Sequence, residues 1–163
     1  MNFQLLKEPE KSYTVKEATI KLMQFFAYRD RCHKEVEEKL REMNMIPAAQ
    51  EQIIMELMQE NFLNEERFAR SFVRGKFRIK KWGKIKIKQE LKFREISAPI
   101  IKIALTEIDE QKYIATIYEV AEKKLKLLKE PDKFKKKRKL ADFLLRKGYE
   151  SNLVYEATNE LLE

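Results

Sequence analysis

The sequence is poor in the residues that punctuate turns, with three glycines and four prolines in 163 residues. A protein built from β-sheets needs such residues at its many turns, so their scarcity argues against a sheet. Lysine, glutamate and leucine, which form helices well, are abundant. We therefore expect an all-α protein.

Cysteine and histidine are equally scarce, with one residue of each, Cys32 and His33. A single cysteine excludes an internal disulfide and a thiolate metal cluster, and it fits a reducing compartment. Sequence neighbours beside a helix start do not face each other, so we interpret the pair as exposed or capping residues rather than a nucleophile and its base. We expect no catalytic residue, no metal and no cofactor, and hence no enzyme.

Long apolar runs are absent as well, since no stretch approaches the roughly 20 residues of a membrane span. The N-terminal segment MNFQLLKEPEKSY lacks the apolar centre of a signal peptide. We expect a cytoplasmic protein without a membrane partner, in which residues 1–12 form an N-terminal tail.

Charge, in contrast, is plentiful and is segregated along the chain, whose formal net charge is +8. Residues 67–94 carry a net +11 and residues 123–147 a net +9, whereas segments 1–66, 95–122 and 148–163 each carry −4. A solvated surface normally mixes its signs, so two basic blocks indicate a polyanionic partner, nucleic acid first and an acidic protein surface second. The alternative is a lysine-rich face that only maintains solubility.

Apolar residues recur with the period of a helix and again after about fifty residues. A shift of 51 aligns Leu40 with Leu91, and a further shift of 53 aligns Leu91 with Leu144. This pattern is typical of repeated helical units that stack to bury a shared core. We expect three tandem three-helix repeats that form an elongated, curved helical protein. The predicted boundaries are 13–62, 63–109 and 110–163.

Residues 84–88 conflict with this interpretation, because KIKIK alternates as a half-buried strand does. The repeat predicts a helix instead, since Ile87 and Leu91 occupy its core positions. Ile85 and Phe93 are then left on another face, for which the pattern offers no role.

The stretch NFLNEERFARSFVRGKFR, residues 61–78, interleaves rings with cations. Such a segment can stack bases and bind phosphates, or it can be an amphipathic helix. Phe68, Phe72 and Phe77 follow one helical stripe, so we interpret the rings as core residues. The arginines form a separate stripe, which we expect to be solvated.

Three segments, in order and at matching spacing, resemble the motifs of a known family. NFLNEERFA at residues 61–69 resembles G-Y-L-D-D-x-R-F-A, KKWGKIKIKQEL at 80–91 resembles K-G-x-G-x-x-x-I-x-x-E-L, and FLLRKGY at 143–149 resembles F-L-x-R-R-G-Y. These are motifs of the RecX family, bacterial regulators of the RecA recombinase. Asn61 and Lys81 stand where the family pattern has glycine, so the bend before the second segment is expected to differ.

The resemblance implies a non-enzymatic protein that lodges along the RecA–DNA filament and restrains strand exchange and ATP hydrolysis, in DNA recombination, DNA repair and the SOS response. We expect a monomer that binds single- and double-stranded DNA weakly and in a salt-sensitive manner. One alternative is a sequence-independent nucleic-acid-binding protein without a recombinase partner, and another is a helical adaptor with an idle basic surface.

The residues predicted to contact nucleic acid or the filament come from the two basic blocks. Trp82 is the only one without charge, and it is either such a contact residue or a peripheral packing residue. The predicted contact residues are Arg67, Arg70, Arg74, Arg78, Lys80, Lys81, Trp82, Lys84, Lys88, Lys135, Lys136, Lys137, Arg138 and Lys139.

Overall fold

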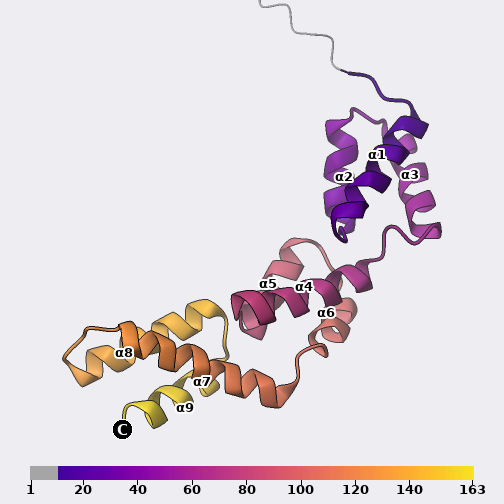
Figure 1. Ribbon diagram of the computed structural model, residues 1–163. Coiled ribbons are helices and arrows are strands. Elements are labelled where there is room, and N and C mark those ends of the chain that lie inside the picture. The colour runs from indigo at the N-terminus through magenta and orange to yellow at the C-terminus, as the bar shows by residue number, and fades with distance from the viewer. Residues whose placement is uncertain (1–10) are drawn as a thin grey trace, which may run out of the picture. The chain divides into compact units, whose positions relative to one another are not determined.

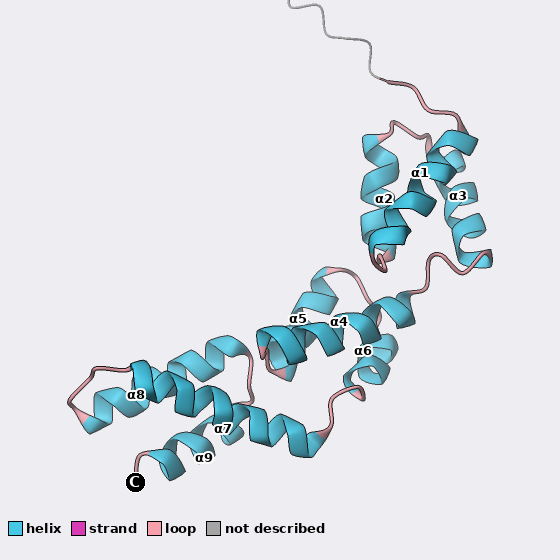
Figure 2. Cartoon of the chain, viewed as in Figure 1, coloured by secondary structure: helices cyan, strands magenta, loops and turns pink. Residues whose placement is uncertain are grey.

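The computed structural model describes residues 11–163, so the predicted tail at residues 1–12 lies outside the described residues except for its last two. Within this range the chain forms nine α-helices and no strand (Figures 1 and 2), which confirms the all-α prediction. The helices are α1 (Val15–Tyr28), α2 (His33–Glu42), α3 (Pro47–Gln59), α4 (Glu65–Lys80), α5 (Lys84–Phe93), α6 (Ala98–Leu105), α7 (Glu110–Leu127), α8 (Lys133–Lys147) and α9 (Ser151–Leu161).

The helices are three tandem sets of three, and the chain divides between residues 65 and 66 into two compact units. The first unit contains α1, α2 and α3, and the second contains the six helices that follow. The exact boundaries of the three repeats stay a prediction. Among residues 11–163, no helix combines the length and the apolar content that crossing a membrane requires.

The first unit shows why its helices begin and end where they do. Thr14 and Glu17 form a capping box at α1, in which the Glu17 N–H donates to Thr14 Oγ1 at 3.2 Å and the Thr14 N–H donates to the Glu17 carboxylate at 2.9 Å. Pro47 occupies the first turn of α3, where a missing N–H costs nothing. The three helices enclose a core that includes the fully buried Leu22 and Leu40.

In the second unit, the segment KIKIK begins α5, so the helical prediction is confirmed. Ile87 and Leu91 are fully buried, and so is Leu144 of α8. Ile85 is 42% exposed and Phe93 is 73% exposed. A strand would place Ile85 on the same face as Ile87, whereas the helix buries Ile87 and Leu91 and leaves Ile85 exposed.

The phenylalanines of α4 are only partly the core residues that the pattern predicts. Phe68 is buried, whereas Phe72 is half-buried and carries the Lys76 ammonium and the Arg94 guanidinium over its ring, at 5.3 and 4.9 Å from the centroid. Phe77 packs on the ring of Tyr113, with the centroids 5.9 Å apart. The stripe therefore contains one buried ring, Phe68, and one ring, Phe72, that two cations cover.

Four non-glycine residues within the described range have a left-handed backbone. Asn44 and Glu95, with φ of 56° and 61°, follow the second helix of their repeats, as Gly148 does with φ of 94°. Asn61 and Lys81, with φ of 57° and 56°, adopt the same conformation where the family pattern has glycine. Lys81 thus forms a left-handed turn in which a lysine is strained, and a bend different from that of the family stays a prediction.

Within the second unit, the start of α5 and the end of α8 are joined by backbone hydrogen bonds. The Gly83 N–H donates to the carbonyl of Lys147 at 2.8 Å, and the Ile85 N–H donates to the carbonyl of Gly148 at 3.0 Å. Donors left unpaired at one helix N-terminus thus meet acceptors left unpaired at another helix C-terminus. We call this contact the α5–α8 joint; Figure 1 shows the end of α8 beside the turn between α4 and α5.

Candidate nucleic-acid interface

The arginines predicted as a solvated stripe lie on α4, and two of them are paired with carboxylates. Arg70 donates to Glu107 at 2.8 Å and to Glu66 at 3.0 Å, and Arg74 contacts Glu107 at 3.1 Å. The hydrogen bonds from Arg70 and then Arg74 lower the pKa of the Glu107 carboxyl. Two carboxylates, Glu66 and Glu107, therefore offset part of the positive charge of this stripe. The stripe consists of Arg67, Arg70, Arg74 and Arg78.

Lys81 contacts the third repeat through its backbone, and Lys84 contacts it through both its backbone and its side chain. The carbonyl of Lys81 accepts a hydrogen bond from the Tyr149 hydroxyl at 2.6 Å. Lys84 pairs with Glu110, its backbone N–H donates to the Tyr113 hydroxyl at 2.9 Å, and its ammonium lies 4.6 Å from the Tyr113 ring centroid. Both residues are therefore partly committed to packing.

Trp82 is half-buried and lies between two lysines that sequence reasoning left out. The Lys76 and Lys86 ammonium nitrogens lie 4.9 and 4.5 Å from the centroid of its ring. Both are within reach of a cation–π attraction. The two lysines belong to the basic block at 67–94, but they lie off the arginine stripe, so only the block charge could have indicated them.

Lys147 brings a third helix to this place. Its ammonium donates to the carbonyl of Lys80 at 3.1 Å. Burial lowers the pKa of the Lys147 ammonium, and the charges of Lys86 and Lys80 lower it further. Lys147 was not among the predicted contact residues, although it lies in the second basic block.

These residues form one group, which we call the joint cluster. Within residues 11–163, none of its four lysines forms an ion pair with a carboxylate. Uncompensated cations around an aromatic ring are the elements that single-stranded nucleic acid sites combine. The joint cluster consists of Lys76, Lys80, Trp82, Lys86 and Lys147.

The remaining predicted residues are not brought to the joint cluster. Lys88 is exposed further along α5. The run from Lys135 to Lys139 occupies the first turns of α8, and Lys139 there pairs with Glu130 at 2.7 Å. Lys137 and Lys147 are ten residues apart on one helix, which separates them by about 15 Å along its axis. The second basic block therefore divides into two separate sites.

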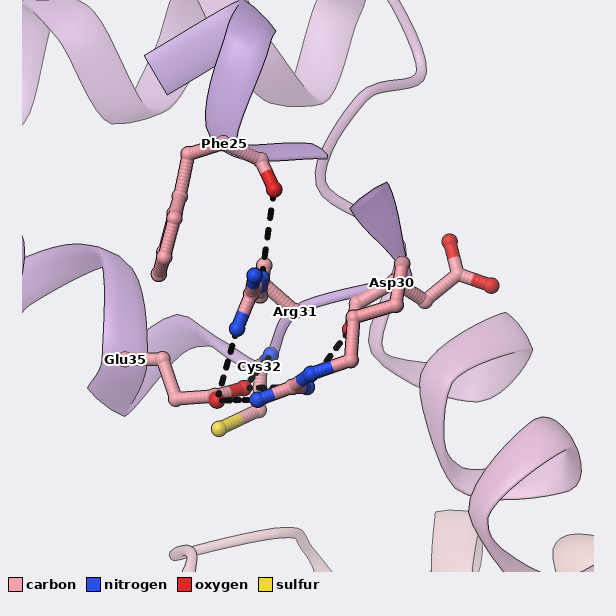
Figure 3. A network of polar contacts seen from close by, with 6 residues as sticks. Phe25, Asp30, Arg31, Cys32 and Glu35 are labelled. Atoms are coloured by element: carbon pink, nitrogen blue, oxygen red, sulfur yellow. Dashed lines mark hydrogen bonds and ion pairs between the residues drawn. The ribbon is translucent and has the colours of Figure 1, made fainter. Parts of the chain in front are cut away.

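The first unit holds a polar network at the place where α1 meets α2 (Figure 3). The Arg31 guanidinium lies 3.8 Å from the Phe25 ring centroid, and its Nε donates to the Phe25 carbonyl at 3.2 Å. Glu35 pairs with Arg29, lies 3.7 Å from Arg31 and accepts the Cys32 N–H at 3.0 Å. The hydrogen bond from Arg29 opposes burial and lowers the pKa of Glu35. Glu35 therefore offsets one of the two positive charges of this network.

Cys32 and His33 show no nucleophilic arrangement. Cys32 is the N-cap residue of α2, one of the two predicted alternatives, and is fully buried. Burial raises the pKa of its thiol to about 11. His33 lies 3.8 Å from Glu37 and 3.6 Å from Glu65, and the described residues contain no group of three side chains suited to a metal ion.

Comparison with known proteins returned one family. The sequence profile for "RecX, second three-helix domain" matches residues 64–105, and that for "RecX, third three-helix domain" matches residues 110–158. The regulatory protein RecX of Clostridium acetobutylicum is 33% identical over 148 residues, which are 88% of this chain and 68% of that protein. The regulatory protein RecX of Bacillus cytotoxicus is 27% identical over 149 residues, 91% of this chain and 55% of that protein. The chain thus spans little more than half the length of this relative.

Solved structures give the same result for the fold. A crystal structure of regulatory protein RecX matches with a TM-score of 0.81 at 22% identity, over 90% of this chain and 73% of the other. The crystal structure of RecX from Lactobacillus salivarius matches with a TM-score of 0.80 at 24% identity, over 90% of this chain and 96% of the other. These similarities extend over both compact units and all three predicted repeats.

Proposed function

Because this chain belongs to the RecX family, a family of regulatory proteins and not of enzymes, we propose that it binds the RecA recombinase–DNA filament and lowers its strand-exchange and ATPase activity. Its role is then in the control of DNA recombination and repair. The relatives are described as regulatory proteins, and RecA is the partner that the resemblance of the motifs implies.

The observation that carries the proposal is the uncompensated charge of the joint cluster. The Lys76 and Lys86 ammonium groups lie over the ring of Trp82, and Lys147 bonds to the Lys80 carbonyl where two repeats meet. No carboxylate of the described chain pairs with these four lysines. A filament presents DNA phosphates and acidic side chains along one groove. A basic site in that groove would hinder the entry of a second DNA duplex, and it attracts its target over about a Debye length.

The experiment is a titration of RecA ATP hydrolysis and strand exchange with this protein, on single-stranded DNA. We expect both activities to fall, with amounts well below one molecule per RecA subunit sufficing if filament growth is blocked. The charge-reversed variant Lys80→Glu/Lys86→Glu should lose most of this effect. A variant with the same change of net charge at exposed lysines outside the cluster, Lys16→Glu/Lys102→Glu, should retain it.

If the protein has no effect at a several-fold excess over RecA, the regulator proposal is wrong. Sequence-independent binding to nucleic acid alone is the second candidate, because the same lysines favour it. In that case the protein should still bind DNA directly. The logarithm of its binding constant should fall with the logarithm of the salt concentration at a slope of roughly −3.5, if about five phosphates of a single strand are neutralised. The two candidates differ in whether the effect on ATP hydrolysis requires RecA or only the coating of DNA.

A further inference from the structure

We propose that the joint cluster is a subsite for one stretch of single-stranded nucleic acid, in which Trp82 stacks on a base and the lysines around it bind the flanking phosphates. The inference rests on the proposed function only in taking nucleic acid as the class of partner. It adds where the strand is held and which two repeats hold it.

The first argument is the proximity of the cations. The Lys76 and Lys86 ammonium groups lie within 4.9 and 4.5 Å of the same ring centroid, so they are no more than about 9 Å apart. Lys147 approaches from α8 and donates to the Lys80 carbonyl at 3.1 Å. Like charges held this close repel one another, and a bound polyanion removes that repulsion.

The second argument is a comparison with the first repeat, which has the same local architecture. The shift of 51 residues places Lys86 where the first repeat has Glu35, and Trp82 where it has Arg31. Glu35 pairs with Arg29 and lies 3.7 Å from Arg31, so it offsets one of the two positive charges of the first network. In the second repeat a cation occupies the position of that carboxylate, and no carboxylate of the described chain pairs with it, so an anion from outside the protein can supply the missing negative charge.

The third argument concerns the ring and decides which anion fits. A cation–π pair also occupies this place in the first repeat, but there the ring belongs to Phe25 and the cation to Arg31. The exchange puts the larger indole ring beneath two lysine ammonium groups. A free phosphate or an acidic peptide makes no use of a ring, whereas a nucleotide presents a π-face between two phosphates.

When nucleic acid binds the joint cluster, existing contacts of the lysines with Trp82 are replaced by contacts with the strand. The two ammonium groups leave the ring of Trp82 for phosphate oxygens, where a charge-assisted hydrogen bond is stronger than a solvated cation–π contact. A base then occupies the face that the lysines vacate. The fluorescence of Trp82 should report this directly, because it is the one tryptophan of the chain.

The test titrates Trp82 fluorescence with an oligo(dT) of about 15 nucleotides, at the upper end of single-strand site sizes, in the absence of RecA. Inorganic polyphosphate and a poly-glutamate peptide are titrated in parallel. We expect strong quenching by oligo(dT), and binding of polyphosphate without comparable quenching. Quenching by poly-glutamate equal to that by oligo(dT) would overturn the assignment to nucleic acid in favour of an acidic protein segment.

Variants locate the strand independently of fluorescence, with a labelled oligonucleotide followed by anisotropy. Lys86→Gln/Lys147→Gln should lower the magnitude of the slope of log K against log salt by about 0.7 per lysine, and Trp82→Leu should weaken binding several-fold without changing the slope. Lys86→Arg/Lys147→Arg should restore the slope, and Lys102→Gln should leave it unchanged. Circular dichroism verifies that each variant is folded. An unchanged slope in the glutamine variant would refute the subsite.

The two proposals fail separately. If the protein does not inhibit RecA but oligo(dT) still quenches the fluorescence of Trp82, the regulatory function is wrong and the subsite stands. Inhibition of RecA without any change of Trp82 fluorescence on adding oligo(dT) would refute the subsite and leave the regulatory function.

Discussion

The ammonium of Lys147 donates a hydrogen bond to the backbone carbonyl of Lys80 at 3.1 Å, across 67 residues of sequence. Lys80 is the last residue of α4 and Lys147 is the last residue of α8, so the contact joins the ends of helices from two repeats. The same joint contains the Gly83 N–H bond to the Lys147 carbonyl. The basic site and the packing between the repeats therefore depend on one another.

Close backbone approach at the α5–α8 joint makes Gly83 intolerant of any side chain. A Cβ at Gly83 would lie 2.2 Å from the carbonyl carbon and oxygen of Gly148, which are backbone atoms that cannot move aside. We expect Gly83→Ala to lower the free energy of unfolding by several kcal/mol, of order 3. Gly75→Ala is the matched control, since a Cβ there meets nothing within 4 Å and should stabilise α4 by about 0.5–1 kcal/mol. Urea denaturation measures both, and equal stabilities would contradict the geometry.

Tyr113 satisfies a backbone donor that has no other partner at the start of α5. Its buried hydroxyl accepts the Lys84 N–H at 2.9 Å and donates to the Glu150 carboxylate at 2.6 Å. Tyr113→Phe leaves both groups without this partner, so we expect a loss of about 1–3 kcal/mol in the free energy of unfolding. Tyr28→Phe, at a position 92% exposed, should change it by less than about 0.5 kcal/mol. Thermal unfolding of the two variants measures the difference, and equal stabilities would contradict the role of the Tyr113 hydroxyl.

The helical core is tested by placing a charge inside it. Leu91 is fully buried, and Leu91→Asp forces an unpaired carboxylate into the packing of α5. We expect this change to cost several kcal/mol, about 3–5, and to unfold a marginal domain. Phe93→Asp is the control on the same helix, because Phe93 is 73% exposed and its replacement should be tolerated. Denaturant unfolding followed by far-UV circular dichroism measures the free energy of unfolding of both variants. A Leu91→Asp variant as stable as the parent protein would contradict the helical core.

The buried thiol of Cys32 predicts a pH dependence of stability. Burial raises its pKa to about 11, above the value of about 8.5 for a solvated thiol in the unfolded chain. The unfolded state therefore loses its proton first, and the contribution of this group to stability, complete below about pH 8.5, is lost as the pH rises towards 11. Urea unfolding at pH 8 and pH 10.5 measures the loss, and Cys32→Ala should remove this part of it.

Reactivity of the same thiol gives a second measurement. At pH 8 the folded protein should react with iodoacetamide at least about 100-fold more slowly than the chain in urea, because both the thiolate fraction and access are reduced. Equal rates would show that the first unit opens on the time scale of the reaction, and would contradict a buried N-cap cysteine.

Much of the fold could be predicted from the sequence, because its signals are local. The capping box at Thr14 and Glu17 and the left-handed stop at Asn44 involve residues at most a few positions apart. The repeat also identified α5 correctly, since Ile87 and Leu91 recur as core positions in a segment whose local alternation suggests a strand. The left-handed backbone of Lys81 was harder to predict, because lysine rarely adopts this conformation.

The candidate site was predicted only in outline. The blocks of charge located Lys80 and Trp82, but Lys86 and Lys147 were left out, because block charge does not show which of its lysines meet in space. Arg70 was assigned to that stripe without knowledge of Glu107, which lies 37 residues further along the chain. The sequence shows how much charge a segment carries, and it does not show which charges meet.

By itself, then, the sequence determined the helical class, the period of about fifty residues and the two basic blocks, since each follows from composition and spacing along the chain. Tertiary structure alone decided which cations are neutralised. Arg70 and Arg74 meet Glu107, whereas Lys147 meets Lys80 and no carboxylate. The physical reason is that the energy of two charges depends on their separation and on the solvent between them, and distance along a chain fixes neither once helices pack.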